Sequence, residues 1–194
     1  MLRPSKSLLL ASSSPYRKAL LNRLGVPFDT ANPAVDESSF STETPEQLSV
    51  RLANAKAKAC AKPGFIVIGS DQVAMLEDRQ LHKPGSAEVA REQLAAMSGA
   101  SVRFFTALSV LDTDAKVEVT EVVSTTVRMR KYSMAEIERY IARDQPLDCA
   151  GAFKWEALGI AMIEKIESPD PTALEGLPLI ALSRILRDRG FLVP

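Results

Sequence analysis

The sequence predicts an α/β protein with a mixed β-sheet flanked by helices. Strand–helix units alternate in the first half of the chain, a long hairpin rich in Val and Thr lies in its middle, and an amphipathic helix closes it. Strand–helix–strand units pair strands in parallel and hairpins pair them antiparallel, so one sheet with both kinds of pairing is expected.

The first strand–helix unit opens the chain. Residues 7–11 form a short apolar run typical of a buried strand. A helix is expected over 15–24, because Ser14 can act as its N-cap and Pro15 loses no useful N–H at the first position. Gly25 suits its C-terminal cap, and residues 27–31 are a candidate second strand.

The second unit is built around a strong apolar strand at 65–68. A loop is expected over 32–44, followed by a helix over 44–61 with Thr44 as cap and Gln47 placed for a capping box. Residues 69–72 then lie at the carboxyl end of the strand, with 73–76 as a candidate continuation.

The rest of the chain contains two long β-branched runs, 102–111 and 117–129, which predict an antiparallel hairpin. Helical patterns and caps are present at 86–97, 134–143 and 178–189. Short strands are expected over 149–155 and 159–166.

The 194 residues fit a single domain spanning 1–194. An apolar share of 46% and a charged share of 25% exclude a disordered or collagen-like chain. Lys and Arg number 24, as do Asp and Glu, so no bulk positive field exists to hold a nucleic acid polymer. Any basic cluster must be local and directed at a small anion.

Several common kinds of site are excluded by composition. His82 is the single histidine, so a zinc site with two or three histidines cannot form within one chain. Cys60 and Cys149 form no CxxC pair and are expected to be reduced, buried thiols. No apolar run reaches the ~18–20 residues of a membrane span, and the N-terminal run is too short for a signal peptide. A cytoplasmic protein without membrane contact is expected.

The turn after the first strand is a candidate phosphate site. A helix N-terminus offers unpaired N–H groups and partial positive charge, to which the Ser12 and Ser14 hydroxyls and the Arg17 and Lys18 cations add donors. An ordinary capped helix with surface cations would show the same pattern.

Acidic residues in two places are candidate metal ligands. Glu37 lies with Asp36 in the long loop, and Asp71 follows a buried strand, where open α/β sheets bind ligands. Carboxylate oxygens suit a hard cation, although turns also use Asp. Lys56 and Lys83, taken singly, are most simply solvated surface charges.

These fragments, in this order, resemble the motifs of the Maf family of nucleoside triphosphate pyrophosphatases. The matching segments span nearly the whole chain, and the ordered set is far more specific than any one piece. They are residues 10–21 (LASSSPYRKALL), 35–37 (VDE), 51–53 (RLA) with Lys56, 68–72 (IGSDQ), 83–84 (KP), 150–153 (AGAF) and 176–178 (GLP).

The resemblance implies a fold similar to that of inosine-triphosphate pyrophosphatases, with an elongated mixed sheet and a cleft between two lobes. It implies that water attacks the α-phosphate of a nucleoside triphosphate, with a divalent metal, Mg²⁺ or Mn²⁺, and that diphosphate leaves. Asp71 would be the proton acceptor and would hold the metal together with Glu37. The residues carried over as phosphate-binding or catalytic are Ser12, Ser14, Arg17, Lys18, Lys56 and Lys83.

The family divides by the base that its members accept. The segment 153–156 (FKWE) and the aromatic Tyr16 resemble the group that acts on 7-methyl-GTP, in which Trp is more frequent at the position of Tyr16. An aromatic face attracts the positive charge of N7-methylated guanine, and Glu156 can accept from its N1–H and N2–H edge. Gln72 is the third expected specificity position.

Two alternatives stay open at this point. The chain can be a pyrophosphatase for dTTP, UTP or another modified nucleotide, or a nucleotide-binding regulator of septum formation without essential catalysis. The resemblance also suggests a homodimer with a house-cleaning role, the removal of unwanted nucleotides.

Overall fold

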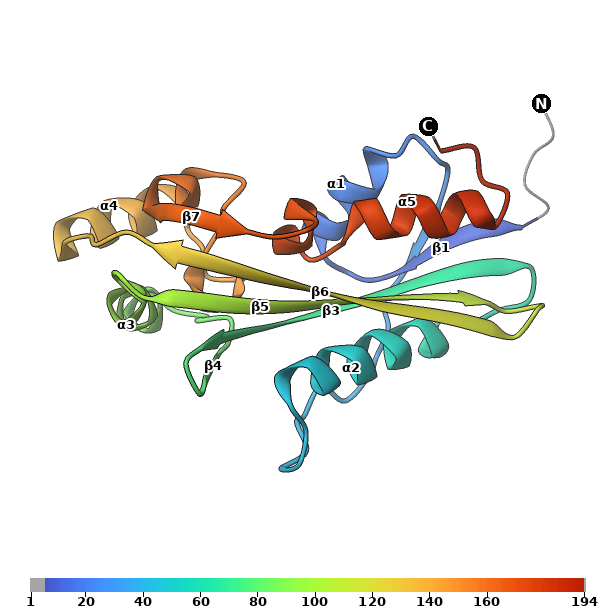
Figure 1. Ribbon diagram of the computed structural model, residues 1–194, viewed down its shortest axis with the longest axis horizontal. Helices are drawn as coiled ribbons and strands as arrows, with labels where there is room; N and C mark the ends of the chain where they lie inside the picture. Colours follow the sequence, from blue (N-terminus) through green and yellow to red (C-terminus); the bar gives the residue numbers. More distant parts are fainter. Residues whose placement is uncertain (1–5, 194) are drawn as a thin grey trace. The chain divides into compact units, whose positions relative to one another are not determined.

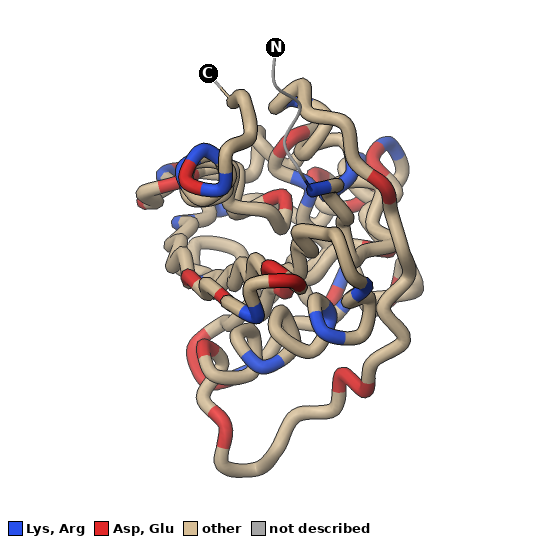
Figure 2. Tube along the Cα trace, turned by 90° about the vertical axis from the view of Figure 1, so that its right-hand side faces the viewer, with Lys and Arg blue, Asp and Glu red and all other residues tan. Residues whose placement is uncertain are grey.

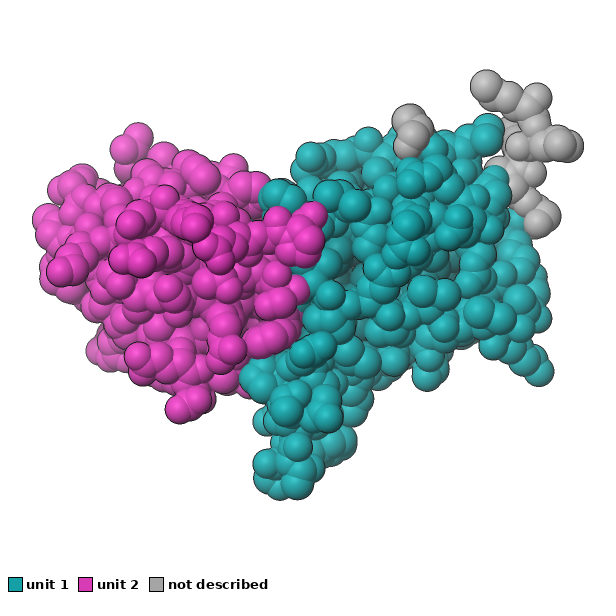
Figure 3. All heavy atoms as spheres, in the orientation of Figure 1, with its two compact units in different colours: residues 1–72, 106–123, 170–194 teal, residues 73–105, 124–169 magenta. Residues whose placement is uncertain are grey.

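The computed structural model describes residues 6–193, which fall into two compact units (Figure 3). Unit 1 holds the described residues up to 72, with 106–123 and 170–193, and unit 2 holds 73–105 and 124–169. The expectation of a single domain over 1–194 stays a prediction.

The strands form one mixed seven-stranded sheet of order β2-β1-β3-β5-β6-β7, with β4 paired to β3. Three long strands, β3 (Phe65–Leu76), β5 (Ser101–Asp112) and β6 (Val117–Met129), contribute residues to both units. The predicted α/β class and mixed sheet are confirmed. The two lobes with a cleft and the similarity to inosine-triphosphate pyrophosphatases stay predictions.

In unit 1, β1 (Ser7–Ala11) pairs in parallel with both β2 (Asp29–Ala31) and β3. Helices α1 (Pro15–Asn22) and α5 (Leu179–Asp188) cover one face of this part of the sheet, and α2 (Pro45–Ala59) covers the other (Figure 1). The turn from β1 into α1 and the long segment from β2 into α2 therefore both belong to this unit.

The alternation of side chains along β1 explains these two layers. Leu8 and Leu10 join the core that contains the apolar residues of α1 and α5. Leu9 and Ala11 point to the opposite face and pack with Ala57 of α2. A strand that is buried on both faces has no polar positions to alternate, which is why the run at 7–11 is continuously apolar after Ser7.

Unit 2 contains β4 (Arg79–Leu81), α3 (Ala87–Met97), α4 (Met134–Asp144) and β7 (Ile163–Glu167). Helices α3 and α4 pack against each other. Ser133 is the N-cap of α4, as the sequence predicts, and α3 begins after its N-cap Ser86, one residue later than the predicted helix.

Two predicted strands are corrected in unit 2. Residues 149–155 form no strand; they contain a short 3₁₀ turn, Ala150–Ala152, because Gly151 at φ +70° and Ala152 at φ +53° turn the backbone away from an extended path. Residues 159–166 are extended only from Ile163 on, after a second 3₁₀ turn at Leu158–Met162. The short strand β4 was not predicted.

The candidate continuation of β3 is confirmed, but the place of Asp71 is corrected. The strand predicted over 65–68 runs on through 69–72 to Leu76, because Ala74–Leu76 pair antiparallel with β4. Asp71 is therefore inside a strand and not at its carboxyl end. The parallel register between β1 and β3 reaches Leu10 opposite Ile68, so Asp71 lies just beyond the carboxyl end of β1. Asp71 therefore still lies at the carboxyl edge of the parallel strands, as expected, but the strand that ends there is β1 and not β3.

Two smaller expectations concern the cysteines and membranes. Cys60 and Cys149 are free thiols, but both are half-buried and not fully buried as predicted. In the part of the chain that the structure describes, no helix is both long and apolar enough to cross a bilayer.

Candidate active site

The turn between β1 and α1 carries the first group of candidate residues. Ser14 is the N-cap of α1, and its Oγ accepts a 3.3 Å hydrogen bond from the backbone N–H of Arg17. The Oγ of the buried Ser12 accepts a 3.1 Å bond from the N–H of Ser14. Because both hydroxyls act as acceptors here, each keeps its own O–H proton for another partner. Lys18 is exposed on the next position of the helix.

Arg17 is held by a backbone carbonyl that lies 159 positions later in the sequence. Its Nε donates a 2.8 Å hydrogen bond to the carbonyl of Gly176, which leaves the two Nη groups of the guanidinium for another acceptor. Burial lowers the pKa of Arg17, and the negative charges of Asp71 and Glu37 act in the opposite direction. Arg17 therefore lies in the electrostatic field of both candidate metal ligands.

Lys56 joins two carboxylates. Its ammonium donates a 2.6 Å hydrogen bond to Asp71 Oδ1 and lies 2.6 Å from Glu37 Oε1. The side chains of Lys56 and Asp71 are 8% and 10% exposed, whereas that of Glu37 is 63% exposed. The structure thus brings Arg17, Glu37, Lys56 and Asp71 into one charged cluster, and Lys56 is a buried partner of the acids and not a solvated surface charge.

The close packing of α2 on β3 makes this contact reachable. A Cβ at Gly69 would lie 2.1 Å from the carbonyl oxygen of Ala53, so no larger residue fits there. Ala53 is three positions before Lys56 on α2, and Gly69 is two positions before Asp71 on β3. The missing side chain at Gly69 lets the helix approach until Lys56 meets Asp71.

The ionisation of Asp71 is shifted by its surroundings. Burial raises the pKa of Asp71, and the nearby charges of Lys56 and Arg17 oppose this without cancelling it. A buried carboxylate with a raised pKa and cationic neighbours is a better proton acceptor near neutral pH than a solvated one.

The two neighbours of Asp71 on β3 anchor the segment 170–178. Gln72 Nε2 donates to Thr106 Oγ1 at 3.0 Å and to the carbonyl of Ala173 at 2.8 Å, which leaves its Oε1 for another donor. Ser70 Oγ lies 2.8 Å from the carbonyl of Gly176, the same oxygen that binds Arg17. The sequence analysis gave no role to Ser70, Thr106 or Gly176, although 176–178 was among the matching motifs.

Of the remaining candidates, Tyr16 is half-buried on α1, whereas Lys83 and Glu156 belong to unit 2. Lys83 is exposed and follows β4. Burial raises the pKa of Glu156, and Lys154 opposes this shift. Next to it, the indole Nε1 of Trp155 is buried and has no hydrogen-bond partner among the described residues.

Charges of both signs are distributed along the chain. Lys and Arg positions are interspersed with Asp and Glu positions along the Cα trace in Figure 2, in keeping with a net charge of +0. Within residues 6–193 no three His, Cys, Asp or Glu side chains gather as a metal site. Glu37 and Asp71 are therefore two protein carboxylates beside one cationic group, with no third protein acid to complete a cage.

The chain thus combines a capped strand–helix turn, a mixed sheet and a buried Lys–Asp pair. The chain is a member of the Maf-like protein family, whose pattern matches residues 7–189. Among its relatives is a protein of Xanthomonas oryzae pv. oryzae (strain MAFF 311018) named 7-methyl-GTP pyrophosphatase, 51% identical over 189 residues, which are 96% of this chain and 98% of that protein.

Two relatives from other genera carry the same name. The protein of Aromatoleum aromaticum is 49% identical over 96% of this chain and 97% of its own length. That of Burkholderia orbicola (strain AU 1054) is 49% identical over 93% of this chain and 88% of its own length.

Proposed function

We propose that this chain is a nucleoside triphosphate pyrophosphatase that hydrolyses 7-methyl-GTP to 7-methyl-GMP and diphosphate. The observation that carries the proposal is the cluster in which the buried Asp71 contacts Lys56, close to the phosphate-type donors of the β1–α1 turn. The name shared by relatives at about half identity supports the choice of substrate.

The residues of the cluster fit attack of water on the α-phosphorus. Asp71 accepts the proton of the attacking water, and its raised pKa suits that task. The guanidinium of Arg17 and the ammonium of Lys56 balance the charge on the phosphate oxygens, which is the main requirement of phosphoryl transfer. The hydroxyls of Ser12 and Ser14, with the N–H groups that begin α1, orient the phosphate chain.

Glu37 and Asp71 are the residues that would hold a divalent cation. Their carboxylates are hard oxygen donors that flank one positive group, Lys56, so a divalent cation would compete with this ammonium for the two acids. Two protein carboxylates completed by substrate phosphates and water are typical of Mg²⁺ sites. Such an ion would supply charge neutralisation at the phosphate oxygens and acidify bound water.

Recognition of the base is assigned to Tyr16, Gln72 and Glu156. The Tyr16 ring offers a π face to the cationic 7-methylguanine, and Glu156 can accept from its N1–H and N2–H edge. Gln72 keeps its Oε1 because its Nε2 is engaged by Thr106 and Ala173.

Hydrolysis in H₂¹⁸O tests the reaction. Attack at the α-phosphorus places the label in 7-methyl-GMP and leaves diphosphate unlabelled, as read by mass spectrometry. Label in diphosphate, or release of inorganic phosphate in place of diphosphate, would contradict the proposed reaction.

A further inference from the structure

The segment between β2 and α2 carries Glu37 and projects from unit 1 as a wide loop (Figure 2). The side chain of Glu37 is 63% exposed, so burial does not fix its position. Residues 32–40 form no helix or strand. Other contacts must hold Glu37 near Lys56.

Arg51, on the second turn of α2, makes three kinds of contact with this loop. Its guanidinium forms a two-pronged ion pair with Glu43, with Nε 2.5 Å from Oε1 and Nη2 3.0 Å from Oε2. Nη2 also donates to the carbonyl of Ser38 at 2.7 Å. The guanidinium lies 4.3 Å from the centre of the Phe40 ring. The side chain of Arg51 thus binds the loop at Ser38 and Phe40 and again at Glu43, shortly before α2 begins.

The contact with Ser38 acts directly next to Glu37. On its other side, Ser38 donates from its N–H and its hydroxyl to Asp36 Oδ1, at 2.9 and 2.6 Å. The backbone of Glu37 is therefore flanked by Asp36, which forms an internal turn, and by Ser38, which is tied to the helix.

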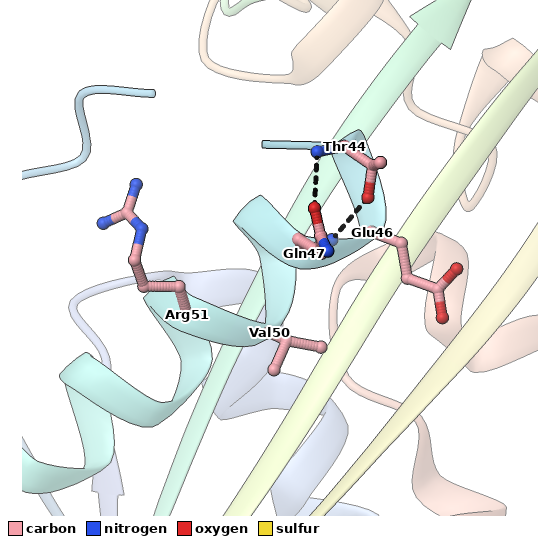
Figure 4. Close-up of a pocket in the computed structure, with 5 residues that line it drawn as sticks. All are labelled: Thr44, Glu46, Gln47, Val50 and Arg51. Atoms are coloured by element: carbon pink, nitrogen blue, oxygen red, sulfur yellow. Dashed lines mark hydrogen bonds between the residues drawn. The ribbon is translucent and has the colours of Figure 1, made fainter. Parts of the chain in front are cut away.

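Arg51 is anchored by the first turns of α2, which begin at a capping box. Thr44 and Gln47 form the capping box, whose two hydrogen bonds are drawn in Figure 4, and Arg51 follows one turn later. Arg51 and Val50 line a pocket of about 430 Å³ with these two residues and Glu46. Arg51 thus extends from a capped helix to the loop, where it contacts Ser38 and Glu43 directly.

We propose that Arg51 is a positioning residue that fixes Glu37 beside Lys56 and Asp71, and so sets the affinity of this pair of carboxylates for a divalent cation. The inference rests on the proposed function for the role of the cation. Among the described residues Arg51 makes no hydrogen bond or ion pair with Lys56 or Asp71, although its charge interacts with that of Asp71 at longer range. In this proposal its effect on the carboxylates is transmitted by the loop that it holds.

The test compares Arg51→Met and Glu43→Gln with Arg91→Met. Arg91 forms a similar two-pronged pair with Glu138 in unit 2 and serves as the matched control. Hydrogen–deuterium exchange over residues 36–43 reports on the loop, and Mn²⁺ binding followed by electron paramagnetic resonance reports on the carboxylates. Both are measured on the intact protein without turnover, with Mn²⁺ alone as the probe.

We expect faster exchange over 36–43 and Mn²⁺ binding weakened about tenfold in Arg51→Met and Glu43→Gln, with neither change in Arg91→Met. Arg51→Lys should be intermediate, because an ammonium cannot form the fork. Faster exchange with unchanged Mn²⁺ binding would overturn the proposal, as would unchanged exchange or a wild-type protein that does not bind Mn²⁺. Failure of the proposed function is read separately, as absence of diphosphate release from the wild type.

Discussion

Lys56 Nζ lies 2.6 Å from Asp71 Oδ1, and both side chains are almost entirely buried. These residues are 15 positions apart and come from α2 and β3, which meet closely because Gly69 has no side chain. The pair consists of a carboxylate that can accept a proton and an ammonium that can contact phosphate. It lies at the edge of the sheet where β1 ends.

Replacing Asp71 with Asn should separate turnover from binding. The amide keeps the size of the side chain but cannot accept the proton of water, so kcat should fall about 10²–10⁴-fold. Binding of a nucleotide, measured by calorimetry without added metal, should persist because Arg17 and Lys56 remain. Normal hydrolysis by Asp71→Asn would show that another group accepts the proton.

The pKa of Asp71 should respond in opposite directions to its two neighbours. Burial already raises it; Lys56 lowers it and Glu37 raises it, so Lys56→Met should raise the pKa further and Glu37→Gln should lower it. Titration of the Asp71 carboxyl carbon by NMR measures both shifts. Equal pKa values in the three proteins would contradict the electrostatic cluster.

The raised pKa of Asp71 also predicts how the activity of the wild-type protein depends on pH. Because the folded-state pKa of Asp71 is raised, the acid limb of kcat/KM should lie above the pKa of about 4 of an ordinary aspartate. Activity is lost as the pH falls through this pKa, whereas protonation of Asp71 favours the folded state over the same range.

Gly176→Ala should weaken phosphate binding through Arg17. Gly176 has φ +95°, and an added Cβ would lie 3.1 Å from the Nε of Arg17. Gly190 is the matched control, since it has φ +83° and nothing within 4 Å of an added Cβ. Both alanine variants should lose about 1 kcal/mol of stability through strain, but only Gly176→Ala should raise KM, by several-fold. Equal KM values for Gly176→Ala and Gly190→Ala would show that Gly176 does not affect phosphate binding.

Asp112 should stabilise the fold in a pH-dependent way. Burial acts to raise its pKa, but hydrogen bonds from Lys6 and from the backbone N–H groups of Ala115 and Asp114 outweigh this, so the pKa is lowered. Asp112 also pairs with Arg189 at 3.2 Å. Its contribution is therefore present above the pKa of an unfolded aspartate and is lost as the pH falls through the lowered value.

Urea denaturation of Asp112→Asn and of the exposed Asp114→Asn measures that contribution. We expect a loss of about 1–2 kcal/mol for Asp112→Asn at pH 7, because its partners are partly exposed, and little change for Asp114→Asn. The difference between the two variants should disappear at acid pH. A difference that does not depend on pH would contradict the ion-pair explanation.

Local signals in the sequence predicted the elements of the fold. Ser14, Thr44 and Ser133 cap helices where expected, because a cap depends on a few neighbouring residues. The strand predicted over 149–155 was wrong, because an apolar run does not reveal that Gly151 and Ala152 have positive φ.

The place of Asp71 inside β3 has a tertiary reason. Ser70, Asp71 and Gln72 interrupt the apolar pattern of the strand, which predicts a strand end at 69–72 with 73–76 only as a candidate continuation. In the folded chain their side chains bind groups far along the sequence, such as the carbonyls of Gly176 and Ala173. No spacing within β3 carries that information.

The site could be predicted only in part from single residues. Glu37, Lys56 and Asp71 each had an ordinary explanation, and the ordered motif set was needed to link them. The roles of all the candidate site residues, the divalent metal and the homodimer stay predictions.

The most direct test of the proposed function is diphosphate release from a panel of nucleotides, 7-methyl-GTP, GTP, dTTP, UTP and CTP, each with Mg²⁺ and with Mn²⁺. We expect kcat/KM to be highest for 7-methyl-GTP, and we expect Glu156→Gln and Tyr16→Ala to reduce this preference over GTP. A higher kcat/KM for dTTP or UTP would contradict the assigned base readers while keeping the reaction. Absence of release from every nucleotide would contradict the enzyme itself and favour a nucleotide-binding regulator.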